Sequence, residues 1–311
     1  MKALGRHLQD YVTLRRQLGF KFYVEGSYLR GFVRFAREQR ATFISTKLAL
    51  RWATLPANIM QKQRGRRLSV VRGFAEYVRM LEPRTEVPAQ KLIPFRDYRP
   101  EPYLYSDRQV LELISAARQI DPEHKIKGLT LGALFGLLAV TGMRVGEALA
   151  LGRDNVDFTE ALLTVRWAKG NKSRLVPLHP STVQALQRYA RLRDKIYPQS
   201  VGPNFFVWDG GRPLRYQVAW EWFRVAACQA GLRQLGGGRG GPRIHDLRHY
   251  FAVRTLLNWY QSDTDVDARL PELTTFLGHG HVSDTYWYVS AVPELLALAT
   301  RRWERAEKGR K

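Results

Sequence analysis

Prolines interrupt the chain between residues 83 and 102 more densely than anywhere else in the sequence. Proline has no backbone N–H and fixes φ, so a segment with this many prolines forms no regular element and acts as a stiff linker. At 311 residues the chain is long enough for two domains, and the linker predicts them at residues 1–98 and 99–311. The prolines concerned are Pro83, Pro88, Pro94, Pro100 and Pro102.

Positive charge is concentrated in the first domain. Residues 1–99 contain 21 Lys and Arg against 7 Asp and Glu, whereas residues 100–311 contain 29 against 21, and the whole chain has a formal charge of +22. Such an excess favours a polyanionic partner, most often nucleic acid. No amphipathic Lys-rich helix supports the alternative, a protein bound to an anionic membrane surface. We therefore expect the first domain to bind DNA, through Lys62, Arg64, Arg66, Arg67 and Arg72.

Both domains are expected to be mainly helical. In the first, apolar residues recur at helical spacing along residues 28–36 and again along residues 68–78. In the second, Ser106-Asp107 is a plausible helix N-cap. Further helices are predicted at 181–196, at 215–230 and from Pro293, which suits a first helical turn, to Arg305.

Two other segments complete the expected second domain. Leu129–Met143 is apolar and broken by glycines, so it is too short to span a bilayer and predicts a buried helix. Apolar residues alternate with others along residues 162–178, on either side of the turn sequence Gly170-Asn171, which predicts a β-hairpin. The predicted fold class is therefore mainly α with a small β-sheet (α+β).

Cysteine usage points to a reducing compartment. Cys228 is the only cysteine, which excludes an intramolecular disulfide, and no signal peptide opens the chain. The cytoplasm is the expected location.

Two arginines are suited to binding a phosphate, because the guanidinium is permanently charged and can bind two oxygens at once. Arg144 directly follows the apolar segment, where a buried cation requires an anion. A phosphate could supply it, and so could Glu147. Arg248 lies three residues after His245, so both share one helix face. His245 could shuttle a proton near neutral pH.

The predicted hairpin carries a cluster of cations at its turn. Lys169 could enter the DNA minor groove and protonate a leaving oxygen, while Lys172 and Arg174 could contact DNA. Exposed, merely solubilising charges are the alternative for all three. His279 could hydrogen-bond a phosphate oxygen.

Tyr288 is the candidate nucleophile. A phenol is a poor nucleophile at pH 7, so it needs a base and cationic neighbours. Tyr286 competes for this role, but two residues apart on a helix face nearly opposite ways, so only one of them enters a site.

A metal site is not expected. His245 and His249 have the spacing of zinc ligands, but Arg248 stands between them and would repel the cation. The carboxylate cluster of a two-metal nuclease is not evident. The glycine-rich stretch at residues 236–241 is too irregular for a nucleotide-binding loop. No cofactor is expected either.

In their order along the chain, these motifs resemble the tyrosine recombinase (phage integrase) family. The resemblance covers about residues 5–300 and implies a helical core-binding (SAM-like) domain followed by a catalytic domain. The motifs are Thr141-Gly142-Met143-Arg144-Val145-Gly146-Glu147, Lys169-Gly170-Asn171-Lys172, His245-Asp246-Leu247-Arg248-His249, Leu277-Gly278-His279, and Tyr288 nine residues after His279.

The resemblance also implies a chemistry. Tyr288 would be joined covalently to a DNA 3′ phosphate and release a 5′ hydroxyl, and neither ATP nor metal would be needed. The residues expected around the scissile phosphate are Arg144, Lys169, His245, Arg248 and His279.

Assembly and biological role are expectations of the same kind. Four protomers, identical or including sister recombinases, would assemble on two specific double-stranded DNA sites, each passing a C-terminal segment to its neighbour. The segment 293–308 suits that docking, although it could equally cap its own domain. The tail from Tyr286 to Leu296 resembles recombinases of mobile elements, which favours transposition or DNA integration. The alternatives are a non-catalytic DNA-binding regulator and a type IB topoisomerase-like enzyme.

Overall fold

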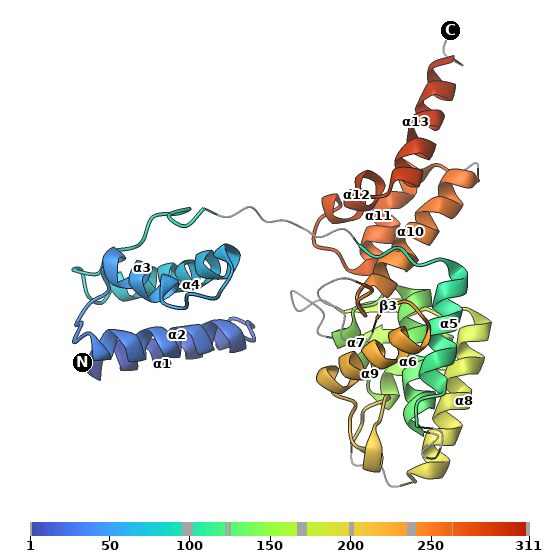
Figure 1. Ribbon diagram of the computed structural model, residues 1–311, viewed down its shortest axis with the longest axis horizontal. Coiled ribbons are helices and arrows are strands. Elements are labelled where there is room, and N and C mark those ends of the chain that lie inside the picture. Colours follow the sequence, from blue (N-terminus) through green and yellow to red (C-terminus); the bar gives the residue numbers. More distant parts are fainter. Residues whose placement is uncertain are drawn as a thin grey trace. The chain divides into compact units, whose positions relative to one another are not determined.

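The computed structural model describes residues 2–94, 102–121, 123, 126–166, 173–198, 202–234, 241–262 and 264–308 (Figure 1). The chain divides into two compact units, Met1–Pro100 and Glu101–Lys311. The division falls inside the proline-rich segment. Which unit binds DNA and which one carries the chemistry stays a prediction.

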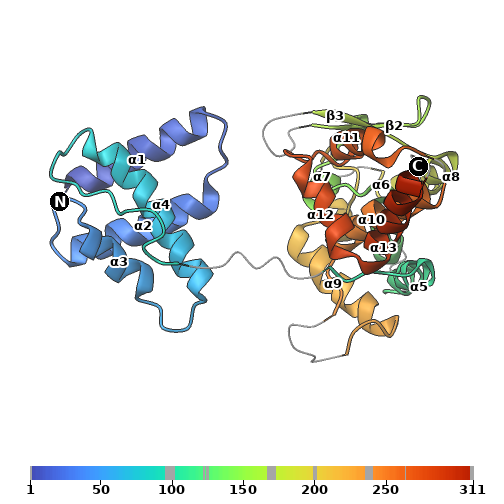
Figure 2. The same cartoon turned by 90° about the horizontal axis from the view of Figure 1, so that it is seen from above.

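The first unit is a helical bundle around an apolar core (Figures 1 and 2). Phe32 and Phe74, from two different helices, are both fully buried there. Trp52 packs edge-on against Phe32, with ring centroids 5.5 Å apart. The helices are α1 (Lys2–Gln17), α2 (Tyr23–Glu38), α3 (Thr46–Thr54) and α4 (Gln61–Arg79).

The second unit is mainly helical, as the sequence predicts. Ser106 and Gln109 form a capping box at the start of its first helix, which confirms the predicted N-cap. The helices are α5 (Asp107–Arg118), α6 (Ile126–Thr141), α7 (Val145–Leu149), α8 (Pro180–Ile196), α9 (Tyr216–Gln229), α10 (Asp246–Gln261), α11 (Val266–Leu277), α12 (Ser283–Ala291) and α13 (Pro293–Lys308), with 3-10 turns η2 (Arg153–Asn155) and η3 (Asp209–Gly211).

The apolar helix α6 lies at the centre of the main core. Leu131, Leu134 and Phe135 are fully buried, and α5, α8 and α10 pack against this helix. Apolar residues lie on every side of the helix because most of its surface faces protein. None of the described helices has the length and apolar character needed to cross a membrane.

One small sheet accompanies these helices, in the order β1–β2–β3. Strands β2 (Leu162–Val165) and β3 (Arg174–Pro177) pair antiparallel, with Leu163 opposite Val176, and form the predicted hairpin. The short strand β1 (Val156–Asp157) pairs antiparallel with β2 and was not predicted. Figure 2 shows β3 beside α11, which brings the hairpin next to the C-terminal helices.

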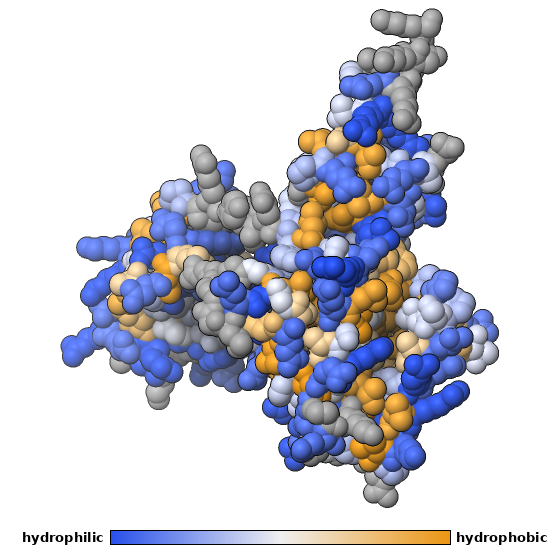
Figure 3. All heavy atoms as spheres, turned by 45° about the vertical axis from the view of Figure 1, so that its right-hand side comes forward, coloured by the Kyte–Doolittle hydropathy of each residue, from blue (hydrophilic) through white to orange (hydrophobic). Residues whose placement is uncertain are grey.

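The C-terminal helices share a smaller core. Tyr288, Val292 and Leu295 are buried against α10 and α11. Arg302 in α13 donates to the carbonyl oxygens of Trp259 and Thr264, so α13 packs on its own unit in this structure. On the face drawn in Figure 3, apolar atoms reach the surface around the base of α13, whereas the first unit is mostly hydrophilic.

Candidate active site

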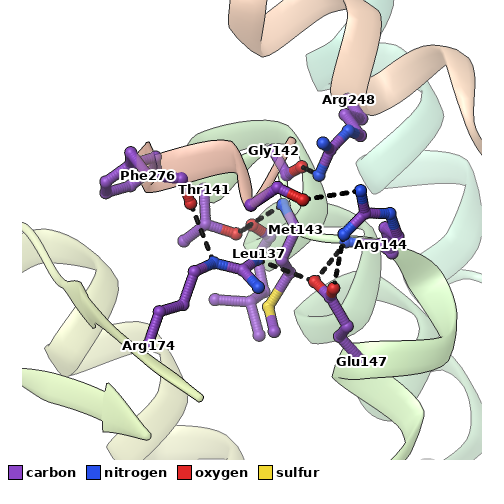
Figure 4. Close-up of polar contacts among 10 residues, drawn as sticks. Leu137, Thr141, Gly142, Met143, Arg144, Glu147, Arg174, Arg248 and Phe276 are labelled. Atoms are coloured by element: carbon purple, nitrogen blue, oxygen red, sulfur yellow. Dashed lines mark hydrogen bonds and ion pairs between the residues drawn. The ribbon is translucent and has the colours of Figure 1, made fainter. Parts of the chain in front are cut away.

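Arg144 stands where α6 ends and α7 begins. Gly142 has a φ of +59° and turns the chain there, which makes Arg144 the N-cap of α7. Its Nη1 donates to Glu147 Oε1 at 2.8 Å, and its Nη2 donates to the Gly278 carbonyl oxygen at 2.8 Å (Figure 4). The ion pair considered from the sequence is therefore present, and it holds the guanidinium beside the end of α11.

Glu147 binds a second arginine, which comes from the hairpin. Arg174 Nη2 lies 2.7 Å from Glu147 Oε2, and Arg174 Nε donates to the Phe276 carbonyl oxygen at 2.9 Å (Figure 4). Burial opposes ionisation of Glu147, but the hydrogen bonds and charges of Arg174 and Arg144 outweigh it and lower its pKa. This network ties α7, β3 and α11 together.

Arg174 is therefore held against Glu147 and the end of α11 instead of being exposed on the hairpin surface. Its side chain is 11% exposed. Its Nη1 is buried and has no hydrogen-bond partner in the described part of the chain. A contact between Arg174 and DNA stays a prediction.

Arg248 is held by α10 and is 2% exposed. Its Nη1 donates to the Gly142 carbonyl oxygen at 2.8 Å, whereas its buried Nη2 has no partner among the described residues (Figure 4). Burial, followed by the positive charge of Arg144, lowers the pKa of Arg248 to about 10. A buried N–H that lacks an acceptor is costly, so the two arginines form a site that favours an anion.

The backbone conformation of Gly278 leaves room for the Arg174 guanidinium, and a substitution there tests this packing. It has a φ of +67°, and an added Cβ would lie 2.9 Å from Arg174 Nη1. We expect Gly278→Ala to lower the free energy of unfolding by about 1–3 kcal/mol, because it strains the backbone and displaces Arg174. Thermal unfolding measures the change. Gly280→Ala is the matched control, since its Cβ would meet no described atom within 4 Å; equal losses in both variants would contradict this account.

His245 lies at the start of α10, just before the fully buried Asp246. Partial burial, followed by the positive charge of Arg248, lowers the pKa of His245 to about 4. The imidazole is therefore neutral near pH 7 and can accept a hydrogen bond, whereas its lowered pKa opposes the proton transfer expected of it from the sequence. Asp246 accepts hydrogen bonds from the backbone N–H and the guanidinium of Arg243, which fixes the first turn of the helix.

Tyr288 and Tyr286 face different environments, as predicted from their spacing. Tyr288 is 1% exposed, whereas Tyr286 is 48% exposed. The Tyr288 hydroxyl lies 3.0 Å from His249 Nδ1. Of the two tyrosines, Tyr288 is therefore the one that is buried against α10, where its hydroxyl contacts the residue after Arg248. Its role as the nucleophile stays a prediction.

His279 also lies beside Tyr288, with its ring stacked at a centroid distance of 6.3 Å. Its Nδ1 lies 2.8 Å from Thr285 Oγ1, and this hydroxyl lies 2.9 Å from Thr274 Oγ1. Sequence reasoning missed the contact of Thr285 with His279 and the contact of His249 with Tyr288. The available signal was that Thr285 and Tyr288 share one helix face at a spacing of three residues.

Two of the predicted site residues, Lys169 and Lys172, lie outside the described residues. The strands on either side of them are described: β2 ends at Val165 and β3 begins at Arg174.

The basic residues of α4 are mostly engaged within the first unit. Arg66 is paired with Glu25 at 3.0 Å and keeps a side chain that is 57% exposed. Arg67 stacks on the Trp52 ring at 3.8 Å. In addition, Lys62 is exposed, Arg64 donates to the carbonyl oxygens of Pro56 and Ala57, and Arg72 lies 3.9 Å from Glu76.

Metal ligands are not gathered at this site. In the ranges that the structure describes, no group of three or more His, Cys, Asp or Glu side chains could hold a metal ion. His245 and His249 face each other edge-on, with ring centroids 4.9 Å apart.

Comparisons with known proteins show which family the chain belongs to. Residues 104–294 match the model of the phage integrase family. The chain is 40% identical over 309 residues to the putative integrase/recombinase y4rB of Sinorhizobium fredii, covering 98% of both chains. It is 32% identical over 240 residues to the tyrosine recombinase XerD of Brucella abortus, covering 74% of this chain and 72% of that one.

A solved structure has a similar fold. It is that of the XerH site-specific recombinase bound to a palindromic difH substrate, in a post-cleavage complex. The TM-score is 0.65 at 19% identity, and the match covers 92% of this chain and 80% of the XerH chain.

Proposed function

Since the chain belongs to the phage integrase family of tyrosine recombinases and is therefore a site-specific recombinase, we propose that it cuts and rejoins DNA through a covalent 3′-phosphotyrosine intermediate on Tyr288. The observation that carries this proposal is the partly buried Arg144 together with the buried Arg248, whose neighbour His249 contacts the Tyr288 hydroxyl. Arg248 keeps one buried guanidinium nitrogen without a partner in the described residues, so an anion bound there would offset the cost of burying it.

The site can supply each element of a transesterification. Oη of Tyr288 attacks the phosphorus while Arg144 and Arg248 neutralise the non-bridging oxygens. The 5′ oxygen leaves with a proton, which the family resemblance assigns to Lys169. His279 adds a hydrogen bond to a phosphate oxygen. Rejoining is the reverse step with a 5′ hydroxyl from the partner strand. Because Tyr288 is 1% exposed, DNA binding has to uncover its hydroxyl.

The first unit is proposed to bind duplex DNA through α4. Arg66→Ala is expected to weaken affinity for all sequences about threefold and to reduce the slope of log K against log salt by about 1. Fluorescence anisotropy at several salt concentrations measures both the affinity and the slope.

Arg67→Ala should instead lower the melting temperature, because Arg67 stacks on Trp52.

The control for the Arg66 prediction is Arg108→Ala. This side chain is 86% exposed and lies on α5 in the second unit. Its removal should leave the salt slope unchanged. An unchanged slope in Arg66→Ala as well would remove Arg66 from the DNA interface.

Assembly and biological role extend the proposal. We expect four protomers, identical or with sister recombinases, to act on two specific DNA sites in the cytoplasm. The resemblance of the C-terminal tail to recombinases of mobile elements favours DNA integration or transposition. XerH, which shares the fold, is bound to its own difH substrate in the structure that matches.

A nicked suicide substrate tests the proposed function. DNA carrying the ends of the element that encodes this chain is incubated with the protein in the presence of a chelator. We expect a denaturation-resistant adduct of protein and DNA. Tight binding with no adduct would favour a non-catalytic regulator. Relaxation of any supercoiled plasmid, whatever its sequence, would favour a topoisomerase-like enzyme.

A further inference from the structure

His249 contacts the hydroxyl of the proposed nucleophile. It follows Arg248 in α10 and is 5% exposed, and its Nδ1 lies 3.0 Å from Tyr288 Oη. Both side chains are buried, and their rings pack with centroids 5.4 Å apart. This hydrogen bond joins helix α10, which carries Arg248, to helix α12, which carries the tyrosine.

The other side of the imidazole faces a buried carboxylate. His249 Nε2 lies 3.9 Å from Asp246 Oδ1, which is beyond a hydrogen bond but within range of an ion pair. Asp246 is fully buried and is held by Arg243, whose Nη2 donates to Oδ1 at 2.8 Å. A proton added to the imidazole would therefore sit between a phenolate and a carboxylate, both of which favour the charged form.

Two further ionisable side chains lie near the ring of His249. The imidazole of His245, which is neutral near pH 7, packs nearly perpendicular to it, with ring centroids 4.9 Å apart. Arg248, the preceding residue, opposes a positive charge on the imidazole, whereas a phosphate bound to Arg144 and Arg248 would offset that opposition. The imidazole is thus best able to take a proton once DNA is in place.

We propose that His249 is a further catalytic residue, the base that takes the proton of Tyr288 during strand cleavage. This inference rests on the proposed function. As Oη bonds to phosphorus, its proton passes to Nδ1, and the bond from phosphorus to the 5′ oxygen breaks. The leaving oxygen takes its proton from the general acid. On rejoining, a 5′ hydroxyl attacks the phosphorus and gives its proton to that same group, and Nδ1 returns its proton to Oη. The chemistry is that of a tyrosine whose proton passes to a histidine, while the nearby carboxylate of Asp246 favours the protonated imidazole.

Two variants remove the proposed base, and one of them keeps a hydrogen bond to the tyrosine. In His249→Asn the amide can still hydrogen-bond the Tyr288 hydroxyl but cannot take its proton, and in His249→Leu both functions are lost. We expect both to slow single-turnover adduct formation on the nicked substrate by about 10²-fold or more. The rate is measured at saturating protein, so that weaker DNA binding does not contribute.

The decisive arm replaces Tyr288 by a fluorinated tyrosine, whose phenol is more acidic and depends less on a base. In the His249→Asn background, fluorotyrosine at position 288 should raise the rate of adduct formation at least tenfold over the same variant with tyrosine. In the wild-type background it should change this rate little. Leu256→Ala is the matched control, because it removes a fully buried side chain from the same helix and should lower stability. Fluorotyrosine should not raise the rate of adduct formation in this variant.

The outcomes are separable. A wild-type rate in His249→Asn, or a slow rate that fluorotyrosine does not restore, would overturn the assignment of His249 as the base while the phosphotyrosine mechanism stands. A wild-type adduct on a residue other than Tyr288, or no adduct at all, would overturn the proposed function and this inference with it.

Discussion

Tyr288→Phe is expected to abolish the covalent protein–DNA adduct, with a loss of at least about 10⁴-fold in the rate of its formation. The substitution removes one hydroxyl and keeps the ring, which is 1% exposed and packs between His249 and His279. DNA affinity should therefore stay within about threefold of wild type. Stability should fall by about 1–3 kcal/mol, because the buried His249 loses its hydrogen bond to this hydroxyl. Denaturing gels and anisotropy measure these effects.

Tyr286→Phe is the matched control for this prediction. Tyr286 lies on the same helix, is 48% exposed, and has its hydroxyl 3.5 Å from Asp267. Its removal should leave adduct formation unchanged. Loss of the adduct in Tyr286→Phe, with retention in Tyr288→Phe, would show that the nucleophile has been misassigned.

Arg248→Gln is expected to reduce adduct formation by about 10³-fold while leaving the free energy of unfolding within about 1 kcal/mol of wild type. Glutamine keeps a neutral N–H donor and removes a buried cation whose Nη2 has no partner in the described structure. That cation destabilises the unbound protein, as its pKa of about 10 indicates. Single-turnover cleavage and thermal unfolding give the two values.

Arg144→Gln provides the contrast. Arg144 is already paired with Glu147 and with the Gly278 carbonyl oxygen, so its removal should cost stability as well as activity. If Arg248→Gln unfolded the protein, or cleaved DNA at the wild-type rate, the proposal that Arg248 binds the scissile phosphate would be wrong.

Much of the fold could be predicted from local signals. The predicted N-cap at Ser106 starts α5, Pro293 opens α13, and the alternation of residues 162–178 gives the β2–β3 hairpin. Each of these signals is complete within a few residues. Strand β1 was missed because two residues are too short for any periodicity, and it forms only where β2 offers an edge.

The site was predictable as a set of residues but not as a set of contacts. Glu147 was considered as a partner of Arg144, three residues away, and that pair is present. Its second partner, Arg174, comes from a strand that tertiary packing alone brings near. The spacing of His245 and His249 raised the question of a metal site, whereas His249 bonds to Tyr288, which is 39 residues away. Such contacts depend on how α10 packs against α12, and no local pattern carries that information.

Identifying the residue that carries the DNA tests the central claim most directly. Wild-type protein is trapped on the nicked substrate in the presence of a chelator, digested with protease and nuclease, and analysed by tandem mass spectrometry. We expect a 3′-phosphonucleotide on Tyr288 and a free 5′ hydroxyl on the released strand. A nucleotide on Tyr286 or on any other residue, or a 5′ phosphate on the released strand, would contradict the account.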